Sequence, residues 1–230
     1  MAKRPVFSAC KDQVGVKERL IDFKWFSGFA VSQKQKSIES LHAEARVFGY
    51  RNLLEISSKS LSEVGVALSA FNLLITTKRF NRSFSVESAF QGSKVFERGG
   101  PYTDLFFVDS LTAKRDIRIK DSGNLVKFYF FGSEFPNKPR TFFYDWLYIN
   151  ALKQNRELCD QIEEFDGFTD IEFNPEKSIN CQAHSVALYL SLKHNGCLEQ
   201  ALSSPEDFLS LTEKHYDQQS RNVTIQKHMF

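Results

Sequence analysis

The sequence SVESAFQGSKVFERGG, residues 85–100, is the stretch that decides the fold. Its apolar residues recur at intervals of three and four, which predicts a helix. Ser85 is a suitable N-cap, because its hydroxyl can accept a hydrogen bond from an amide of the first turn. Gly99 and Gly100 supply the left-handed residue that ends helices, and Pro101 prevents the helix from resuming. The pattern therefore predicts a helix that runs from residue 85 to the two glycines.

Two charged residues of this predicted helix, Glu87 and Lys94, are separated by seven positions. Seven residues make about two turns, or about 10 Å along the helix axis. The carboxylate and the amine would be too far apart to neutralise each other, and they could flank a ligand. A solvated charged face is nevertheless the commoner explanation for charges at this spacing.

The segments before residue 85 alternate between predicted strand and predicted helix. Residues 66–76 form an apolar run typical of a buried strand, and residues 76–86 alternate as its hairpin partner would. Residues 35–48 carry apolar residues at helical spacing and end at Gly49, which predicts a helix. The other segments are predicted as a weakly patterned lead-in (1–24), an aromatic strand or hairpin arm (24–31), a short strand (53–57) and a capped single turn (60–63).

Helices dominate the prediction after Pro101. Residues 142–153 place aromatic and aliphatic residues on one stripe, and residues 204–207 combine a cap, a proline at the first helical position and two acids. Residues 125–131 are rich in aromatic residues, which favours a strand. The remaining segments are predicted as a turn and helix (103–123), a helix (157–165), a strand or loop (168–174), a helix (179–194) and a frayed tail (217–230).

The whole chain is predicted to form one α+β domain over residues 1–230, predominantly helical, with a few short strands near the N-terminal half. No repeat or linker divides it, and a hydrophobic content of 42% in 230 residues is enough for a real core. The net charge of +2 argues against tight non-specific binding to nucleic acid, but leaves room for a local patch that contacts a single strand. The sequence shows no membrane span and no signal peptide, so we expect a cytoplasmic protein.

The cysteines and histidines do not predict a metal site. Cys181 and His184 resemble one half of a zinc site, and His194 and Cys197 resemble the other. The residues between them read as one continuous helix, which would separate the halves by roughly 15–20 Å. Motifs for dinucleotide, P-loop, zinc-protease and serine-hydrolase sites are lacking as well. We therefore expect neither a metal nor another cofactor.

Carboxylates beside aromatic residues are the remaining chemical signal. Asp145 lies between Tyr144 and Trp146, and Asp170 and Glu172 lie in the sequence FTDIEF. A glycosidic site needs such a combination, because rings stack on bases or ribose while carboxylates act at an oxocarbenium-like centre. In a chain with 23 phenylalanines, most aromatic residues are expected to belong to the core.

Four segments together resemble the NADAR superfamily, which has the YbiA-like fold. They are SAFNL (69–73), VESAFQGSKVF (86–96), FYDWLYINAL (143–152) and FTDIEFNPEKSINCQA (168–183). The resemblance covers residues 66–194, and its most specific part is the spacing VE-x-x-F-Q-x-x-K-V-F. With KWFSGFAVSQKQKSIESL and FERGGPYTDL, the chain resembles most the NADAR antitoxins that are paired with guanine-specific DarT toxins.

This resemblance implies a hydrolase, an N-glycosidase that removes ADP-ribose from guanine bases of single-stranded DNA and so acts as the antitoxin of a DarT-type toxin. The motifs place catalytic roles on Glu87, Lys94 and Asp170. Lys94 would hold a phosphate, protonate the base or form a Schiff base, and Lys78 is a rival for the lysine role. We expect the substrate to contact Ser69, Phe71, Asn72, Lys78, Gly99, Gly100, Tyr102, Tyr144, Trp146 and Asn180.

Two alternatives remain from the sequence. One is a glycosidase acting on a small metabolite related to ADP-ribose or to the riboflavin pathway. The other is a non-catalytic reader of ADP-ribose, or a protein that masks the toxin directly. An open groove edged by basic residues would favour DNA, and the candidates for its edge are Lys34, Lys36, Arg79 and Arg82.

Overall fold

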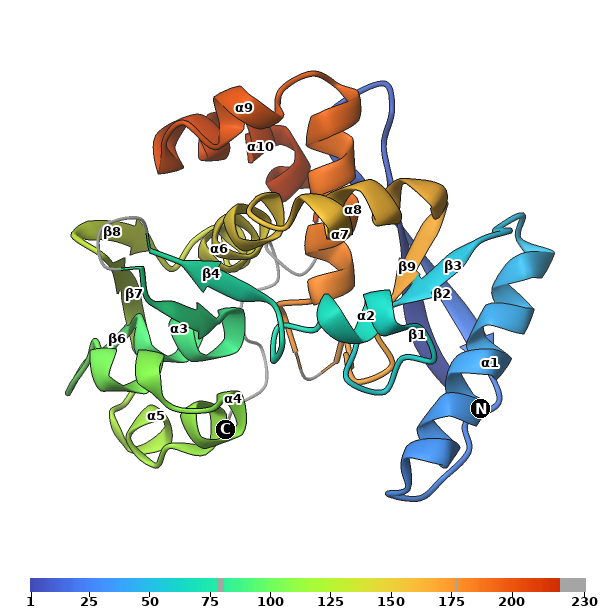
Figure 1. The fold of residues 1–230 in the computed structure, drawn as a ribbon, viewed down its shortest axis with the longest axis horizontal. Coiled ribbons are helices and arrows are strands. Elements are labelled where there is room, and N and C mark those ends of the chain that lie inside the picture. Colours follow the sequence, from blue (N-terminus) through green and yellow to red (C-terminus); the bar gives the residue numbers. More distant parts are fainter. Residues whose placement is uncertain (78–80, 177, 220–230) are drawn as a thin grey trace.

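A four-stranded sheet forms one end of the molecule. The computed structural model describes residues 1–77, 81–176 and 178–219, and their first sheet has the strand order β2-β1-β9-β3. Its strands are β1 (Ala2–Ala9), β2 (Val16–Phe23), β3 (Leu53–Glu55) and β9 (Gly167–Thr169). Helix α1 (Val31–Val47) lies beside this sheet in Figure 1, and the pairing of β3 with β9 is parallel. The predicted lead-in over residues 1–24 is therefore a long antiparallel hairpin.

A smaller sheet forms the other end of the molecule, together with several short helices (Figure 1). Its strands are β6 (Lys94–Phe96), β7 (Leu125–Phe130) and β8 (Ser133–Pro136), and β4 (Leu74–Thr76) pairs separately with β5 (Ser83–Ser85). The short helices of the molecule are α2 (Glu63–Ala67), η1 (Thr103–Phe107), α4 (Ser110–Arg115), α5 (Arg118–Asp121), α7 (Arg156–Gln161), η2 (Ile162–Glu164) and α9 (Leu198–Ala201).

Helix α3 (Val86–Gly92) begins as predicted but ends much earlier. The hydroxyl of Ser85 accepts a hydrogen bond from the Ser88 amide at 3.0 Å, which confirms the N-cap. The helix stops at Gly92, whose Cα is pressed against Phe106 so closely that an added Cβ would lie 2.6 Å from that ring. The next residues pair with β7 as β6, so the predicted continuation to Gly99 and Gly100 is wrong.

Helices α6 (Phe142–Lys153) and α8 (Gln182–His194) run through the middle of the core, and α10 (Pro205–Gln218) packs against them. Almost every side chain of α8 is buried, so its hydrophobic surface is not confined to one stripe. One hydrophobic cluster includes Phe7 of the first sheet, Phe128 of the second and the buried faces of all three helices. The helices predicted over residues 142–153, 179–194 and from Ser204 are confirmed.

Several other predictions require correction. Helix makes up 45% of the structure and strand 20%, so the fold is mixed rather than predominantly helical, and β7, β8 and β9 lie in the second half of the chain. Residues 24–30 are irregular rather than a strand, and the apolar run 66–76 contributes only the short β4. The helix after residue 60 begins at Glu63, and Ser62 in its N-cap position makes no capping hydrogen bond through its side chain. The predicted frayed tail lies mostly outside the described residues, and α10 ends at Gln218.

The turn between β7 and β8 carries a bulky residue in an unfavourable conformation. Phe131 has a φ of +46° and Gly132 a φ of +92°, and the flanking residues Phe130 and Ser133 are paired. A two-residue turn with both central φ values positive favours Asn-Gly. A phenylalanine there costs roughly 1–2 kcal/mol. The residue is 53% exposed, and the buried part of its ring packs against Phe84, Phe106 and Phe130.

A buried hydrogen-bond network around Asp145 joins α6, α8 and α10. One carboxylate oxygen accepts hydrogen bonds from Ser185 Oγ at 2.6 Å and His184 Nδ1 at 3.1 Å, and the other accepts from Tyr216 Oη at 3.2 Å. Burial alone would raise the pKa of Asp145, but the interactions with His184 and Ser185 outweigh it and hold this pKa below its usual range. The network explains why an acidic residue is tolerated in the core.

We expect Asp145→Ala to lower the free energy of unfolding by about 3 kcal/mol or more, because the donors around the carboxylate lose their acceptor. Denaturant unfolding measures the loss, and Asp160→Ala on the exposed face of α7 is the control. The folded-state pKa of Asp145 is lowered, so the loss should be complete above about pH 4 and should shrink as the pH falls further. Equal effects of both variants would contradict this role for the network.

No helix among the described residues is long and apolar enough to cross a membrane.

Candidate active site

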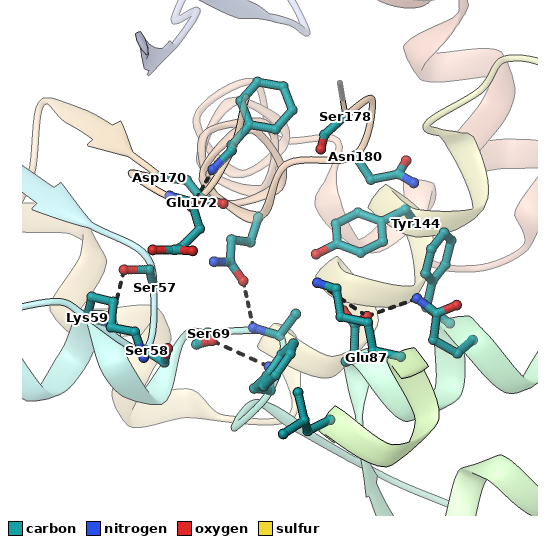
Figure 2. Close-up of a pocket in the computed structure, with 18 of the residues that line it drawn as sticks. Ser57, Ser58, Lys59, Ser69, Glu87, Tyr144, Asp170, Glu172, Ser178 and Asn180 are labelled. Atoms are coloured by element: carbon teal, nitrogen blue, oxygen red, sulfur yellow. Dashed lines mark hydrogen bonds and ion pairs between the residues drawn. The ribbon is translucent and has the colours of Figure 1, made fainter. Parts of the chain in front are cut away.

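A cavity of about 600 Å³ lies between the two ends of the molecule and is lined by segments that are distant in sequence. Residues 57–59 and 170–173 follow β3 and β9, so the carboxyl ends of two parallel strands form one wall. Figure 2 shows Asp170 and Ser57 on one side of the cavity, with Tyr144 and Glu87 on the other. Ser178 and Asn180 close it from the segment that precedes α8.

Glu87 reaches this cavity from the first turn of α3 and is only 6% exposed. Its Oε1 accepts a hydrogen bond from Gln91 Nε2 at 2.9 Å, one helical turn further on. The same oxygen lies 3.7 Å from Lys114 Nζ, at the entrance of the cavity. A carboxylate held by one donor and one ammonium group is therefore presented to whatever occupies the cavity.

Lys94 lies on β6 and contacts Gln91, the residue that donates a hydrogen bond to Glu87. Its Nζ donates to Gln91 Oε1 at 2.7 Å and lies 4.6 Å from the centre of the Phe90 ring. Because an ammonium group can only donate, it fixes the Gln91 amide with Nε2 towards Glu87. Burial lowers the pKa of Lys94 to about 8, and the Glu87 charge opposes this shift. Lys94 is not among the described residues that line the cavity.

Asp170 lies directly after β9, on the opposite wall from Glu87. One carboxyl oxygen accepts hydrogen bonds from the backbone amides of Glu172 at 3.0 Å and Phe173 at 3.2 Å. Burial raises the pKa of Asp170 well above its usual range, and the neighbouring Glu55 raises it further. Glu55 also holds both neighbours of Asp170 in the chain, because it accepts from Thr169 Oγ1 at 2.6 Å and from the Ile171 amide at 2.8 Å.

Other predicted substrate contacts, Ser69, Phe71, Tyr144 and Asn180, also line the cavity. The hydroxyl of Tyr144 points into the middle of the cavity in Figure 2, and burial raises the pKa of this tyrosine well above its usual range. Asn180 Oδ1 is buried and has no hydrogen-bond partner among the described residues. A buried acceptor that is unpaired and lies on a cavity wall is suited to accept a hydrogen bond from a donor group of a ligand.

The chain matches one protein family over nearly its whole length. A family model described as DarT1-associated NADAR antitoxin matches residues 2–222. The chain belongs to this family. No individually curated protein matches it. The match extends well beyond residues 66–194, and so includes the N-terminal hairpin, α1 and α10.

In this NADAR antitoxin, several predicted substrate contacts do not line the large cavity. Asn72 lines a smaller, separate pocket, and Trp146 packs against Phe130 and Phe135. Gly99 is required for packing, because an added Cβ would lie 2.2 Å from the Tyr102 hydroxyl. Gly100 and Tyr102 do not line the large cavity either. The predicted contact Lys78 and the predicted groove residue Arg79 lie outside the described residues.

The cavity of the antitoxin also contains residues that the sequence did not single out. Gln182 joins two of its walls, because Oε1 accepts from the Ala70 amide at 2.7 Å and Nε2 donates to the Ile56 carbonyl at 2.5 Å. Lys114 and Arg115 enter from α4 and Lys59 from the turn after β3. The sequence offers only a weak signal for these cations, since each belongs to a short polar segment with no recognisable motif.

Proposed function

We propose that this NADAR antitoxin is an N-glycosidase that removes ADP-ribose from guanine bases of single-stranded DNA, and that it reverses the action of a DarT-type toxin in this way. The observation that carries the proposal is the pair of carboxyl groups in one cavity, in contrasting environments. Glu87 lies beside the ammonium group of Lys114, whereas burial raises the pKa of Asp170. Such a contrast is typical of sites that need one charged and one protonated carboxyl group.

The reaction breaks the bond between the anomeric carbon of the ribose and a nitrogen of guanine. Asp170 in its protonated form donates its proton to the departing nitrogen, and the bonding electrons leave with the base. The Glu87 carboxylate stabilises the positive charge that develops on the anomeric carbon. A water oxygen then bonds to that carbon, and its proton returns to Asp170. The products are free ADP-ribose and an unmodified guanine.

The cavity has room and charge for the ADP-ribose. Its volume of about 600 Å³ lies within the usual range for pockets that bind small molecules. Lys59 on one wall, with Lys114 and Arg115 on another, can contact the diphosphate. The rings of Phe71, Phe90 and Tyr144 offer apolar surface for the adenine or the ribose.

The test uses a single-stranded oligonucleotide that carries ADP-ribose on one guanine. We expect the purified protein to remove one ADP-ribose, which mass spectrometry detects as a loss of mass and chromatography as released ADP-ribose. A strand modified on thymine is the matched substrate control and should remain modified. If the guanine strand stays modified at high protein concentration, the DNA reaction is excluded. Release of ADP-ribose from a small nucleoside adduct in that case would favour a metabolite glycosidase.

For Lys94 the structure supports a positioning role rather than a covalent one. We expect Lys94→Met to lower kcat about tenfold, the equivalent of one hydrogen bond, because the Gln91 amide loses its fixed orientation. Borohydride added during turnover should trap no adduct on Lys94, since its ammonium is engaged by Gln91. An adduct on Lys94, mapped by peptide mass spectrometry, would instead establish Schiff-base chemistry.

The same variant has a characteristic effect on stability. Burial lowers the folded-state pKa of Lys94 to about 8, so below that pH the folded protein holds a buried ammonium group at a cost in stability that is absent at pH 10.5. Replacement by methionine should therefore raise the free energy of unfolding more at pH 7 than at pH 10.5. A loss of activity with equal destabilisation at both pH values would indicate a damaged fold instead.

A further inference from the structure

Two exposed phenylalanines form a surface at the end of the molecule that carries the smaller sheet. Phe107 is 58% exposed and Phe131 is 53% exposed. Both pack against the buried ring of Phe84, at centroid distances of 6.5 Å and 6.0 Å, and both contact Phe106. The two exposed rings therefore lie on the same side of the molecule, fixed by a rigid layer of buried aromatic residues beneath them.

Packing against Phe84, Phe106 and Phe130 accounts for the buried part of the Phe131 side chain, but turn chemistry does not favour a phenylalanine at this position. It occupies a left-handed position in the turn between β7 and β8 where asparagine is favoured, and half of its side chain remains in water. Strained residues of this kind persist where the side chain is needed for another purpose. An exposed aromatic ring on a strained turn points to binding.

An arginine lies against one of these rings, and the chain leads from that ring to the cavity within a few residues. Arg82 lies with its guanidinium carbon 5.2 Å from the centre of the Phe107 ring. Four residues after Phe107, Leu111 lines the cavity, and so do Lys114 and Arg115 of the same helix. Four residues span at most about 14 Å. At a rise of about 3.4 Å per stacked nucleotide, this distance corresponds to roughly four nucleotides.

We propose that Phe107, Phe131 and Arg82 form a platform for single-stranded DNA that flanks the modified guanine. Bases stack on the two phenylalanines, while phosphates contact Arg82 and the cations of α4. Aromatic rings interspersed with cations are the general means of binding a single strand without reading its sequence. This inference rests on the proposed function, since it assigns to the substrate a second region outside the cavity.

The test compares a long and a short substrate. We expect Phe131→Asn to lower kcat/KM at least about fivefold on an ADP-ribosylated 12-nucleotide strand, because one stacking contact is lost. Activity on ADP-ribosylated deoxyguanosine should not change. Asparagine suits the turn, which opposes the loss of ring contacts with Phe84 and Phe106, and thermal unfolding checks that the variant is folded. Phe29→Asn, which changes a fully exposed phenylalanine in the segment before α1, is the control and should leave both activities unchanged.

Every other result of this experiment either contradicts the platform or distinguishes its failure from a failure of the proposed function. Unchanged kcat/KM of Phe131→Asn on the long strand overturns the platform, and so does an equal loss on both substrates. Loss of toxin binding with unchanged DNA activity would assign the surface to a protein partner. If the wild type cleaves neither substrate, the proposed function fails. The platform is then tested separately, by fluorescence anisotropy with an unmodified single strand. Phe131→Asn must weaken that binding for the platform proposal to stand.

Discussion

Glu87→Gln is expected to lower the rate of ADP-ribose release at least a hundredfold, with ADP-ribose binding and fold retained. The neutral amide keeps the size of the side chain but removes the negative charge that would face the anomeric carbon. Loss of one such electrostatic contact typically costs a factor of a hundred to a thousand in kcat. Single-turnover release from the guanine-modified strand measures the effect, and calorimetry with ADP-ribose measures the retained binding.

Glu172→Gln is the matched control for this experiment. Glu172 lines the same cavity, but its side chain is about half exposed and lies 3.3 Å from Lys34. Loss of this surface ion pair should change the rate little. Full activity of Glu87→Gln would remove Glu87 from the mechanism, and equal losses in both variants would indicate a general effect of charge in the cavity.

Asp170→Asn should have an effect of similar size, because the amide cannot supply the proton to the departing base. General acid catalysis contributes about a hundredfold to ten-thousandfold. The wild type should lose activity as the pH rises through the raised pKa of Asp170, since only the protonated carboxyl donates. The residual activity of Asp170→Asn should lack this alkaline limb. The pH profile of kcat under saturating substrate shows both effects.

Glu55→Gln tests the cause of the raised pKa. The negative charge of Glu55 favours the protonated form of Asp170, so its removal should shift the alkaline limb towards lower pH. Several other groups also interact electrostatically with Asp170 and should be kept unchanged in this comparison: Arg4, Tyr144, Tyr148, Glu172 and Cys181. An unshifted limb in Glu55→Gln would mean that the charge of Glu55 does not contribute to the raised pKa of Asp170.

Local signals in the sequence were sufficient for the well-capped and strongly apolar elements. Ser85 and Ser204 both cap helices through hydrogen bonds to amides three residues on, as their positions predict. Residues 125–130 form a strand because the aromatic side chains pack across a pleated surface. In these segments the local preference and the tertiary environment favour the same structure, so the sequence alone is informative.

Elsewhere the tertiary environment overrode the local pattern. Residues 94–96 continue the helical spacing of α3, yet pairing with β7 and the contact of Gly92 with Phe106 convert them to a strand. The hairpin of β1 and β2 escaped prediction because half of the residues of β2 are charged and the strand buries only Ile21 and Phe23. Its pattern of apolar residues is too short to stand out from a polar loop.

Spacing and aromatic neighbours singled out Glu87, Asp170 and Tyr144 as candidates for the site, and the family resemblance gave them roles and added Asn180. Glu87, Asp170, Tyr144 and Asn180 line one cavity, as that resemblance implies. Lys94 was expected on the same helix as Glu87, but it acts on Glu87 through Gln91 from a strand. Lys114 and Gln182 were missed because their roles depend on contacts across long sequence separations, which no local pattern records.

The strand order β2-β1-β9-β3 has a consequence for protein synthesis. Strand β9, which ends at Thr169, lies between β1 and β3, which end at Ala9 and Glu55. A ribosome adding about 5–20 residues per second needs roughly 10–30 s to proceed from β1 to β9. During this time the nascent chain lacks the strand that joins β1 to β3, and it lacks Asp170. A chain that stops before β9 therefore has an incomplete sheet and lacks one of the two carboxyl groups to which we assign the reaction.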